Sequence, residues 1–482
     1  MDLERLIFLI IYLGNFAFVL FLVFGAKKET RSTLLWIMVS ALFPGLSIIL
    51  YIFIGQDFRK KKMFSVKEDQ DKILRDLTEE QNRAIYRGEL FFKNRRNNDY
   101  KKLITLNLNS DDAIFTQDNE IETFYWGEDK FDSLIKDIEN AKESIDIQYY
   151  IFKMDDIGEK IFKTLEKKID EGVKVRLLVD GIGGRFLRKK RSYIKEFEKK
   201  GGEFAIFFPS FLNINIRVNY RNHRKIVIID NKIGYIGGFN IGDDYLGKYK
   251  KFGPWRDTHI RIEGNAIYGL KTRFIKDWYY AKGENIQKEP NIKYFDEAKG
   301  NVGIQILTSG PDTEKENIKN AMLEMISQAN ERIVIQSPYF IPDESLIDAL
   351  SNALYSGVQV DIMIPNKPDH PVVYWATTSY AADLMKMGAN VYIYNKGFLH
   401  SKVINVDDYL TLVGSANFDN RSFILNFEAN ALIYDEEITK DFLEQFEIDI
   451  KDSIIMDKES YENRSLGQKI KEPISRLFSP LL

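Results

Sequence analysis

Two short segments carry the residues best suited to chemistry, and they repeat the same order of residue types. HRKIVIID occupies residues 223–230 and HSKVINVD occupies residues 400–407, so each has the form HxKxxxxD. If each segment is a strand, its histidine and lysine project from the same face. An imidazole beside an ammonium group is a compact binding site for an anion. Two such pairs are able to surround one phosphate.

The two pairs together supply what the transfer of a phosphodiester requires. One of the two histidines, His223 or His400, would attack phosphorus while the other protonates the leaving alcohol. The ammonium groups of Lys225 and Lys402 would stabilise charge on the non-bridging oxygens. Because this chemistry needs neither a metal nor an organic cofactor, we expect none.

Matching residues continue downstream of each histidine. IGGFN at residues 236–240 matches VGSAN at residues 413–417, which places Asn240 and Asn417 each 17 residues after its histidine. Their amides are expected to donate hydrogen bonds to the phosphate. Asp257 follows His223 by 34 residues and Glu428 follows His400 by 28. Each carboxylate is paired here with the histidine of its own half. It is expected to accept a hydrogen bond from the far nitrogen of that imidazole and so fix the tautomer.

A single HxK segment most often marks an exposed strand with two charges, but recurrence with the same downstream asparagine makes coincidence improbable. The chain has only four histidines. Of the remaining two, His259 is expected on a strand as a packing or surface residue, and His370 in a solvent-exposed loop. Neither is assigned a catalytic role.

The sequence segments expected to position these residues also occur twice in the chain. AKESIDIQYYIF at residues 141–152 matches ANERIVIQSPYF at residues 329–340, and EGVKVRLLVD at residues 171–180 matches SGVQVDIMIP at residues 356–365. Short β-branched runs alternate with helical stretches, a pattern typical of buried strands in an α/β layered fold. We therefore predict two homologous α/β halves, residues 111–295 and 296–482, packed face to face.

The amino-acid composition limits both the chemistry and the kinds of partner to be expected. There is no cysteine, which excludes disulfides, thiolate metal ligands and a cysteine nucleophile. Lys and Arg total 68 against 71 Asp and Glu, so the overall charge gives no reason to expect a nucleic-acid partner.

The amino-terminal region predicts a membrane anchor. Residues 6–24 and 34–54 are two uncharged, apolar runs. The length of each is close to the ~20 residues that a helix needs to cross a bilayer. A transmembrane hairpin is expected over residues 1–56, followed by a charged helical connector over residues 57–110. The Pro44-Gly45 pair leaves a kinked, re-entrant second helix open as an alternative.

Basic residues around the hairpin predict its orientation. Lys27, Lys28 and Arg31 lie in the connection, whereas Arg5, Arg59 and residues 60–62 lie on the other side, a balance that favours a multi-pass protein with a cytoplasmic catalytic portion. An aromatic and basic stretch could either dip into the interface or pack as a loop with a solvated rim. It comprises Phe207, Phe208, Phe211, Arg217, Arg221 and Arg224.

The duplicated HxKxxxxD motif, with a following GG or GS and an asparagine, resembles the phospholipase D superfamily from about residue 111 to the carboxyl end. Within it the chain is most similar to bacterial cardiolipin synthases. The segments that carry this similarity are YYIFKMDDIG, WRDTHIRIEG, SPYFIPD, GSANFDNRSFILNFE, the terminal LFSPLL and the amino-terminal LLWIMVSALFPGLSIILYIFIG.

The resemblance implies two α/β sandwich halves and a phosphatidyl-histidine intermediate, with His223 as the nucleophile and His400 as general acid and then base. It implies that Asp230 and Asp407 support local structure, and that Asp257 and Glu428 orient the imidazoles. Phosphatidylglycerol and anionic membrane lipid are the implied partners, with cardiolipin and glycerol as products. The residues leave alternatives open: hydrolysis, a phosphatidyltransferase using phosphatidylethanolamine, or a non-enzymatic lipid-binding scaffold. The oligomeric state is open too.

Overall fold

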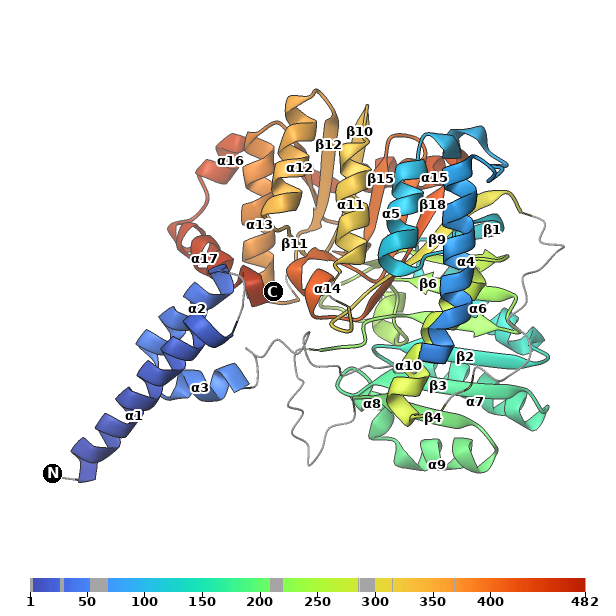
Figure 1. Ribbon diagram of the computed structural model, residues 1–482, viewed down its shortest axis with the longest axis horizontal. Coiled ribbons are helices and arrows are strands. Elements are labelled where there is room, and N and C mark those ends of the chain that lie inside the picture. The colour runs from blue at the N-terminus through green and yellow to red at the C-terminus, as the bar shows by residue number, and fades with distance from the viewer. Residues whose placement is uncertain are drawn as a thin grey trace.

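The computed structural model describes residues 3–26, 30–52, 68–208, 220–284, 286, 300–313, 315–367 and 369–481. A large α/β body makes up most of it, and the amino-terminal helices project from one side of that body (Figure 1).

The first half is a sheet with the strand order β1-β8-β6-β5-β2-β3-β4, in which β2, β3 and β4 run parallel. Its strands are β1 (Thr116–Phe124), β2 (Ser144–Tyr149), β3 (Lys174–Asp180), β4 (Glu203–Phe207), β5 (Ile226–Ile229), β6 (Ile233–Gly237) and β8 (His259–Glu263). Its helices are α6 (Gly127–Asn140), α7 (Asp156–Asp170), α8 (Arg185–Arg188), α9 (Arg191–Lys199) and α10 (Ile267–Lys282).

The second half repeats this order as β9-β18-β16-β15-β10-β12-β13, with β19 added at the edge. Its strands are β9 (Val302–Ser309), β10 (Arg332–Gln336), β12 (Gln359–Pro365), β13 (Asn390–Tyr394), β15 (Val403–Val406), β16 (Leu410–Gly414), β18 (Glu428–Tyr434) and β19 (Ser453–Ile455). Its helices are α11 (Asn317–Ser327), α12 (Glu344–Tyr355), α13 (Pro371–Lys386), α14 (Asn420–Ile424), α15 (Glu436–Lys451), α16 (Lys458–Glu462) and α17 (Leu466–Leu477).

Local sequence explains these elements. Helix α7 buries Ile157, Ile161 and Leu165 at helical spacing, and Asp155 caps it by accepting a hydrogen bond from the Gly158 amide at 3.3 Å. Strand β3 is buried from Val175 to Asp180, because helices cover one face and the core covers the other.

The two halves meet in two ways. Strands β1 and β9 pair antiparallel, so both sheets join into one sheet of 15 strands, a continuity that the sequence did not predict. The halves also share a hydrophobic core, in which Ile226 and Ile260 of the first half cluster with Val413 and Ala431 of the second. The predicted α/β class and the packing of the halves against each other are confirmed. The residue at which the halves divide stays a prediction.

The predicted connector is helical where it is described. Helices α4 (Glu68–Arg87) and α5 (Lys101–Asp111) precede the first strand of the body. Leu103, Ile104 and Leu108 of α5 are buried in the core of the second half, next to α11 and β9. Helix α5 is therefore packed into the α/β body.

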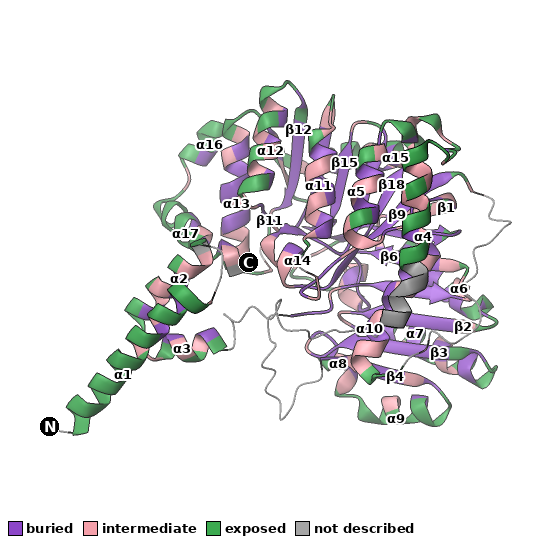
Figure 2. Cartoon of the chain, in the orientation of Figure 1, coloured by how far each residue is buried: buried purple, intermediate pink, exposed green. Residues whose placement is uncertain are grey.

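The amino-terminal region comprises α1 (Leu3–Leu20), a π-helical turn (Phe21–Gly25), α2 (Thr30–Leu42) and α3 (Leu46–Leu50). Among the described residues, Leu3–Gly25 is the one helix long and apolar enough to cross a membrane, and most of its surface is exposed (Figure 2). The second predicted span is interrupted before α3, where Gly45 has φ +79°. Lys27, Lys28, Arg59, residues 60–62 and the Arg31 side chain, on which the predicted orientation depends, lie outside the described residues.

Candidate active site

The two HxK segments lie immediately before β5 and β15, and each is held by the opposite half of the molecule. The His223 amide donates to the Phe427 carbonyl at 2.9 Å, and the His400 amide donates to the Arg256 carbonyl at 2.7 Å. Strand β14 (Phe398–Leu399) also pairs in parallel with β7 (Trp255–Arg256). The backbone pairing therefore brings both histidines to the seam between the halves.

Each imidazole contacts a carboxylate of the other half. Nδ1 of His223 lies 3.0 Å from Oε1 of Glu428, and Nδ1 of His400 lies 2.6 Å from Oδ2 of Asp257. The prediction that each carboxylate serves the histidine of its own half was wrong. An ionised carboxylate only accepts hydrogen bonds, so Nδ1 carries the hydrogen and Nε2 of each ring presents a lone pair to a substrate.

Both lysines are packed against the histidines that precede them. Nζ of Lys225 donates to the His223 carbonyl at 2.6 Å, and Nζ of Lys402 lies 3.0 Å from Nδ1 of His400. Burial lowers the pKa of Lys225 to about 7 and that of Lys402 to about 8. A phosphate between them would favour the ammonium forms and raise both pKa values again.

The lowered pKa values favour the neutral form of both imidazoles. Burial lowers the pKa of His223, and burial together with the Lys402 charge lowers the pKa of His400 to about 4. Burial opposes ionisation of Asp257 and Glu428, but the neighbouring lysines and histidines outweigh it and hold the pKa of each carboxylate below its ordinary value. Neutral imidazoles beside ionised carboxylates suit nucleophilic attack and proton abstraction.

The two predicted asparagines differ in their contacts. Asn240 accepts from the Ile151 amide at 3.1 Å and donates to the Tyr245 hydroxyl at 3.0 Å, so its amide already has protein partners. Asn417 is buried, and its Oδ1 has no hydrogen-bond partner among the described residues. Asn240 is thus tied to neighbouring protein groups, whereas the side-chain oxygen of Asn417 is left unpaired among the described residues.

The two motif aspartates lie in turns, where Asp230 and Asp407 have φ +52° and +51°. Asp230 accepts from three consecutive backbone amides of residues 142–144, at 2.7 to 2.9 Å. Asp407 accepts in the same way from the amides of residues 330–332. Each aspartate therefore ties its turn to the start of β2 or β10, a geometry that fits the structural role implied by the resemblance.

The other two histidines lie away from this chemistry. His259 is fully buried on β8, so of the two predicted alternatives the packing role holds, and His370 is exposed at the start of α13.

Phe207 and Phe208 both pack on Phe427, and their ring centroids lie 5.0 and 5.9 Å, respectively, from the centroid of the Phe427 ring. These two aromatic residues are therefore core residues, and the suggested dip into the membrane was wrong for them; Phe211 and Arg217 lie outside the described residues.

Arg224 is a site residue that the sequence left open as either a membrane-facing residue or part of a solvated basic rim. It is fully buried; its Nε donates to the Glu428 carbonyl at 3.0 Å and its Nη1 lies 2.9 Å from both oxygens of Asp277. Arg224 thus holds the backbone of Glu428, the residue whose carboxylate contacts His223. The matching residue of the second motif is Ser401, whose Oγ lies 2.7 Å from Oγ1 of Thr258 beside Asp257. The difference between HRK and HSK was the only sequence signal for this asymmetry.

Other contacts that the sequence did not predict complete the surroundings of the two imidazoles. The Ser415 hydroxyl donates to Oε2 of Glu428 at 2.5 Å, whereas the matching Gly238 has no room for a side chain because a Cβ there would lie 1.9 Å from Oδ1 of Asp257. The rings of Tyr150 and Trp255 each lie 5.0 Å, between centroids, from the imidazoles of His223 and His400 respectively. Both imidazoles are thus held between an aromatic ring and a carboxylate.

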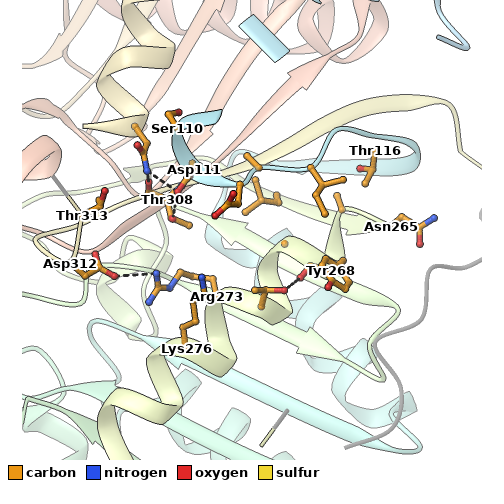
Figure 3. A pocket seen from close by; sticks show the side chains of 18 of the residues that line it. Ser110, Asp111, Thr116, Asn265, Tyr268, Arg273, Lys276, Thr308, Asp312 and Thr313 are labelled. Carbon is orange, nitrogen blue, oxygen red and sulfur yellow. Dashed lines mark hydrogen bonds and ion pairs between the residues drawn. The ribbon is translucent and has the colours of Figure 1, made fainter. Parts of the chain in front are cut away.

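A cavity of about 260 Å³ lies apart from this seam, between the end of α5, helix α10 and strand β9 (Figure 3). None of the predicted site residues lines it. Arg273 reaches into it and lies 3.3 Å from Oδ2 of Asp312, while its other nitrogen lies 2.6 Å from Asp277. The cavity is therefore connected to Arg224 through a buried ion pair, but it is not the site of the paired histidines.

Comparison with known families matches two separate stretches of the chain to one description. Residues 134–251 and 322–450 match a family described as cardiolipin synthase, phospholipase D-like domain. Residues 14–56 match a family described as the amino-terminal region of phospholipase D-nucleases. The two longer stretches include both HxK segments and Glu428.

Curated relatives match from end to end. The chain is 46% identical over 482 residues to the cardiolipin synthase of Oceanobacillus iheyensis, and 47% identical over 485 aligned positions to the major cardiolipin synthase ClsA of Bacillus subtilis, with 100% of both chains covered in each case. Among solved structures, phosphatidylserine synthase of Haemophilus influenzae aligns with a TM-score of 0.59 and 17% identity, over 79% of this chain and 100% of that one. At that identity the likeness supports the fold alone.

Proposed function

The chain belongs to the family of cardiolipin synthases with phospholipase D-like domains, and we propose that it joins two phosphatidylglycerol molecules into cardiolipin and releases glycerol. The observation that carries the proposal is the pair of imidazoles at the seam, each oriented by a carboxylate of the opposite half. The end-to-end similarity to relatives named cardiolipin synthase supports the choice of substrate.

In the first step Nε2 of His223 attacks the phosphorus of one phosphatidylglycerol. A phosphorus–nitrogen bond forms, the bond from phosphorus to the glycerol headgroup oxygen breaks, and His400 in its protonated form gives that oxygen a proton. The anionic phosphate raises the pKa of the nearby His400, so substrate binding itself favours the proton that this step uses.

In the second step the hydroxyl of another phosphatidylglycerol takes the position of the released glycerol. Nε2 of His400 accepts its proton, its oxygen attacks phosphorus, and the bond to His223 breaks to give cardiolipin. Lys225, Lys402 and Asn417 stabilise charge on the non-bridging oxygens in both steps, with Asn240 shaping the adjacent backbone. Asp257 and Glu428 hold the tautomers, while Asp230 and Asp407 hold the turns.

Membrane attachment favours lipid over water as the acceptor, because it concentrates the lipid alcohol and limits hydration of the site. We propose that α1 and the α2–α3 segment form a two-helix membrane hairpin with the catalytic body on the cytoplasmic side. The Ser40 hydroxyl donates to Oδ1 of Asn15 at 2.6 Å, and the Asn15 amide donates to the Ser40 carbonyl at 3.2 Å. Polar bonds of this kind between apolar helices support such a hairpin.

Purified protein incubated with phosphatidylglycerol labelled in its headgroup and acyl chains tests the proposed reaction. Cardiolipin and glycerol in equal amounts are expected, and both are expected to disappear in His223→Ala. Phosphatidic acid as the main product would indicate hydrolysis. No turnover by well-folded protein would indicate a lipid-binding scaffold.

A further inference from the structure

We propose that helix α17 lies on the membrane surface with its exposed apolar stripe in the bilayer, and that it seats the active-site seam against the lipid. This inference extends the proposed function from the reaction to the way the site meets its substrate.

The polarity of α17 is inverted relative to a helix on the surface of a soluble protein. Leu466, Ile470, Ile474 and Leu477 are 75%, 54%, 51% and 51% exposed. Their spacing of four, four and three residues places them in one stripe along the helix. Glu472, by contrast, is only 2% exposed. Apolar residues therefore face outward while a carboxylate faces the protein.

Buried polar contacts fix this orientation. Glu472 accepts hydrogen bonds from the Tyr461 hydroxyl at 2.7 Å and from Nε of Arg464 at 3.0 Å. Arg476 forms an ion pair with Asp383, and its guanidinium carbon lies over the Tyr380 ring, 4.2 Å from the ring centroid. Rotating the helix about its axis to cover the apolar stripe would break these charged contacts. Breaking the Glu472–Arg464 contact would be costly because the Glu472 carboxylate is buried.

The charges beside the apolar stripe favour an anionic bilayer as the surface that covers it. Lys469 and Lys471 are exposed on the same helix, and Nζ of Lys471 lies 4.8 Å from the centre of the Trp375 ring. Lysines beside an apolar stripe, with an aromatic ring between water and hydrocarbon, are the features of helices that lie in a membrane interface. In Figure 1, α17 lies on the same side of the α/β body as the apolar helices α1, α2 and α3.

The helix is also connected to the active site. The chain continues from α17 into a 3-10 turn (Ser479–Leu481). Oγ of Ser479 lies 3.1 Å from the Tyr380 hydroxyl, and its carbonyl accepts from the Asn420 amide group at 3.4 Å. Asn420 begins α14, three residues after Asn417. A helix seated in the interface would thus hold the loop of the second motif close to the headgroups.

The absence of cysteine from the sequence makes a direct test possible, since one introduced cysteine gives one label. An environment-sensitive fluorophore would be attached to Ile474→Cys, and separately to Tyr355→Cys, in the full chain reconstituted into phosphatidylglycerol vesicles. Tyr355 is 74% exposed at the end of α12 and serves as the control. Spin-labelled lipids should quench the label at position 474 and not the label at position 355. Absence of quenching at 474, or labels at 474 that quench one another between copies of the chain, would overturn the proposal.

Turnover provides the functional test. The triple variant Leu466→Gln, Ile470→Gln and Ile474→Gln should lose about tenfold or more of its activity on vesicles, because less apolar area enters the interface. Activity on short-chain phosphatidylglycerol dissolved as monomers should be unchanged, and Tyr355→Gln should match the parent protein on both substrates. Equal loss on both substrates, or loss on neither, would overturn the proposal. If the parent protein itself makes no cardiolipin, the proposed function fails, while the quenching experiment still decides the position of α17.

Discussion

Nδ1 of His400 lies 2.6 Å from Oδ2 of Asp257, although the two residues belong to different halves of the molecule. In the same way, Nδ1 of His223 in the first half lies 3.0 Å from Oε1 of Glu428 in the second half. Neither of these two pairs is therefore complete within one half, and both form only when the halves meet.

The exchange of carboxylates predicts which histidine each variant disturbs. Asp257→Asn should lower kcat by on the order of 10²-fold or more, because an amide no longer fixes the reactive tautomer. With only four histidines in the chain, ¹⁵N-labelled imidazoles can be resolved by NMR. The Asp257→Asn change should shift the Nδ1 signal of His400, and Glu428→Gln should shift that of His223. The opposite assignment would show that each carboxylate serves its own half.

Substrate binding should depend on pH through the two lysines. Burial lowers their pKa values to about 7 and about 8, and a bound phosphate favours the protonated forms. Binding at higher pH must therefore be accompanied by proton uptake, so affinity falls as pH rises. Titration calorimetry with a non-reactive phosphatidylglycerol analogue should show Kd rising above about pH 7, and more steeply above about pH 8, by up to about tenfold per pH unit for each proton taken up. A Kd that stays constant from pH 7 to 9.5 would contradict this expectation.

Asp277 should be important for both stability and rate. Its carboxylate pairs with buried Arg224, which in turn holds the Glu428 carbonyl. Asp277→Asn leaves that charge without its partner and should lower the free energy of unfolding by about 3–5 kcal/mol. It should also lower kcat more than it raises KM. Chemical denaturation and steady-state kinetics measure both effects.

The control for Asp277 is Asp408→Asn, which breaks an exposed pair with Arg96. An exposed pair contributes about 0–1 kcal/mol, so this variant should remain close to the parent protein. Equal destabilisation by the two variants would show that burial of the Arg224–Asp277 pair has no special effect.

The motif aspartates should behave as structural residues. Asp230→Ala removes three hydrogen bonds to backbone amides and should lower Tm, while the protein that remains folded keeps kcat within a few-fold of the parent value. Thermal unfolding and active-site-normalised turnover separate these effects. A loss of kcat as large as that of His223→Ala, with Tm unchanged, would instead place Asp230 in the chemistry.

The proposed reaction should not respond to chelators. Lys225 and Lys402 supply the positive charge that a metal ion would otherwise bring to the phosphate. Cardiolipin formation should therefore continue at its normal rate in EDTA. Loss of activity in EDTA that a divalent ion restores would count against the mechanism.

Sequence reasoning singled out the two histidines that meet at the seam because a repeated motif marks them. Both HxK segments, the downstream asparagines and the α/β alternation follow from local spacing, and local spacing reports the local backbone. The resemblance to cardiolipin synthases was confirmed by relatives that match the whole chain.

What the sequence missed are contacts between distant residues. Asp257 and His400 are 143 positions apart, and a repeat does not reveal whether equivalent carboxylates serve their own half or the other one. The burial of Arg224 was missed for a related reason: an arginine in a basic stretch looks solvated until its partner Asp277, 53 positions away, is known. The pairing of β1 with β9 depends likewise on how the halves dock.

In the proposed reaction two histidines share one phosphate, and His223 forms the covalent bond to phosphorus. The most direct test is to mix the enzyme with phosphatidylglycerol labelled with ³²P, stop the reaction within one turnover, and map the labelled peptide. A base-stable label is expected on His223; it should be absent from His223→Ala and should disappear when unlabelled phosphatidylglycerol is added. Label on His400, or normal turnover with no labelled protein, would contradict it.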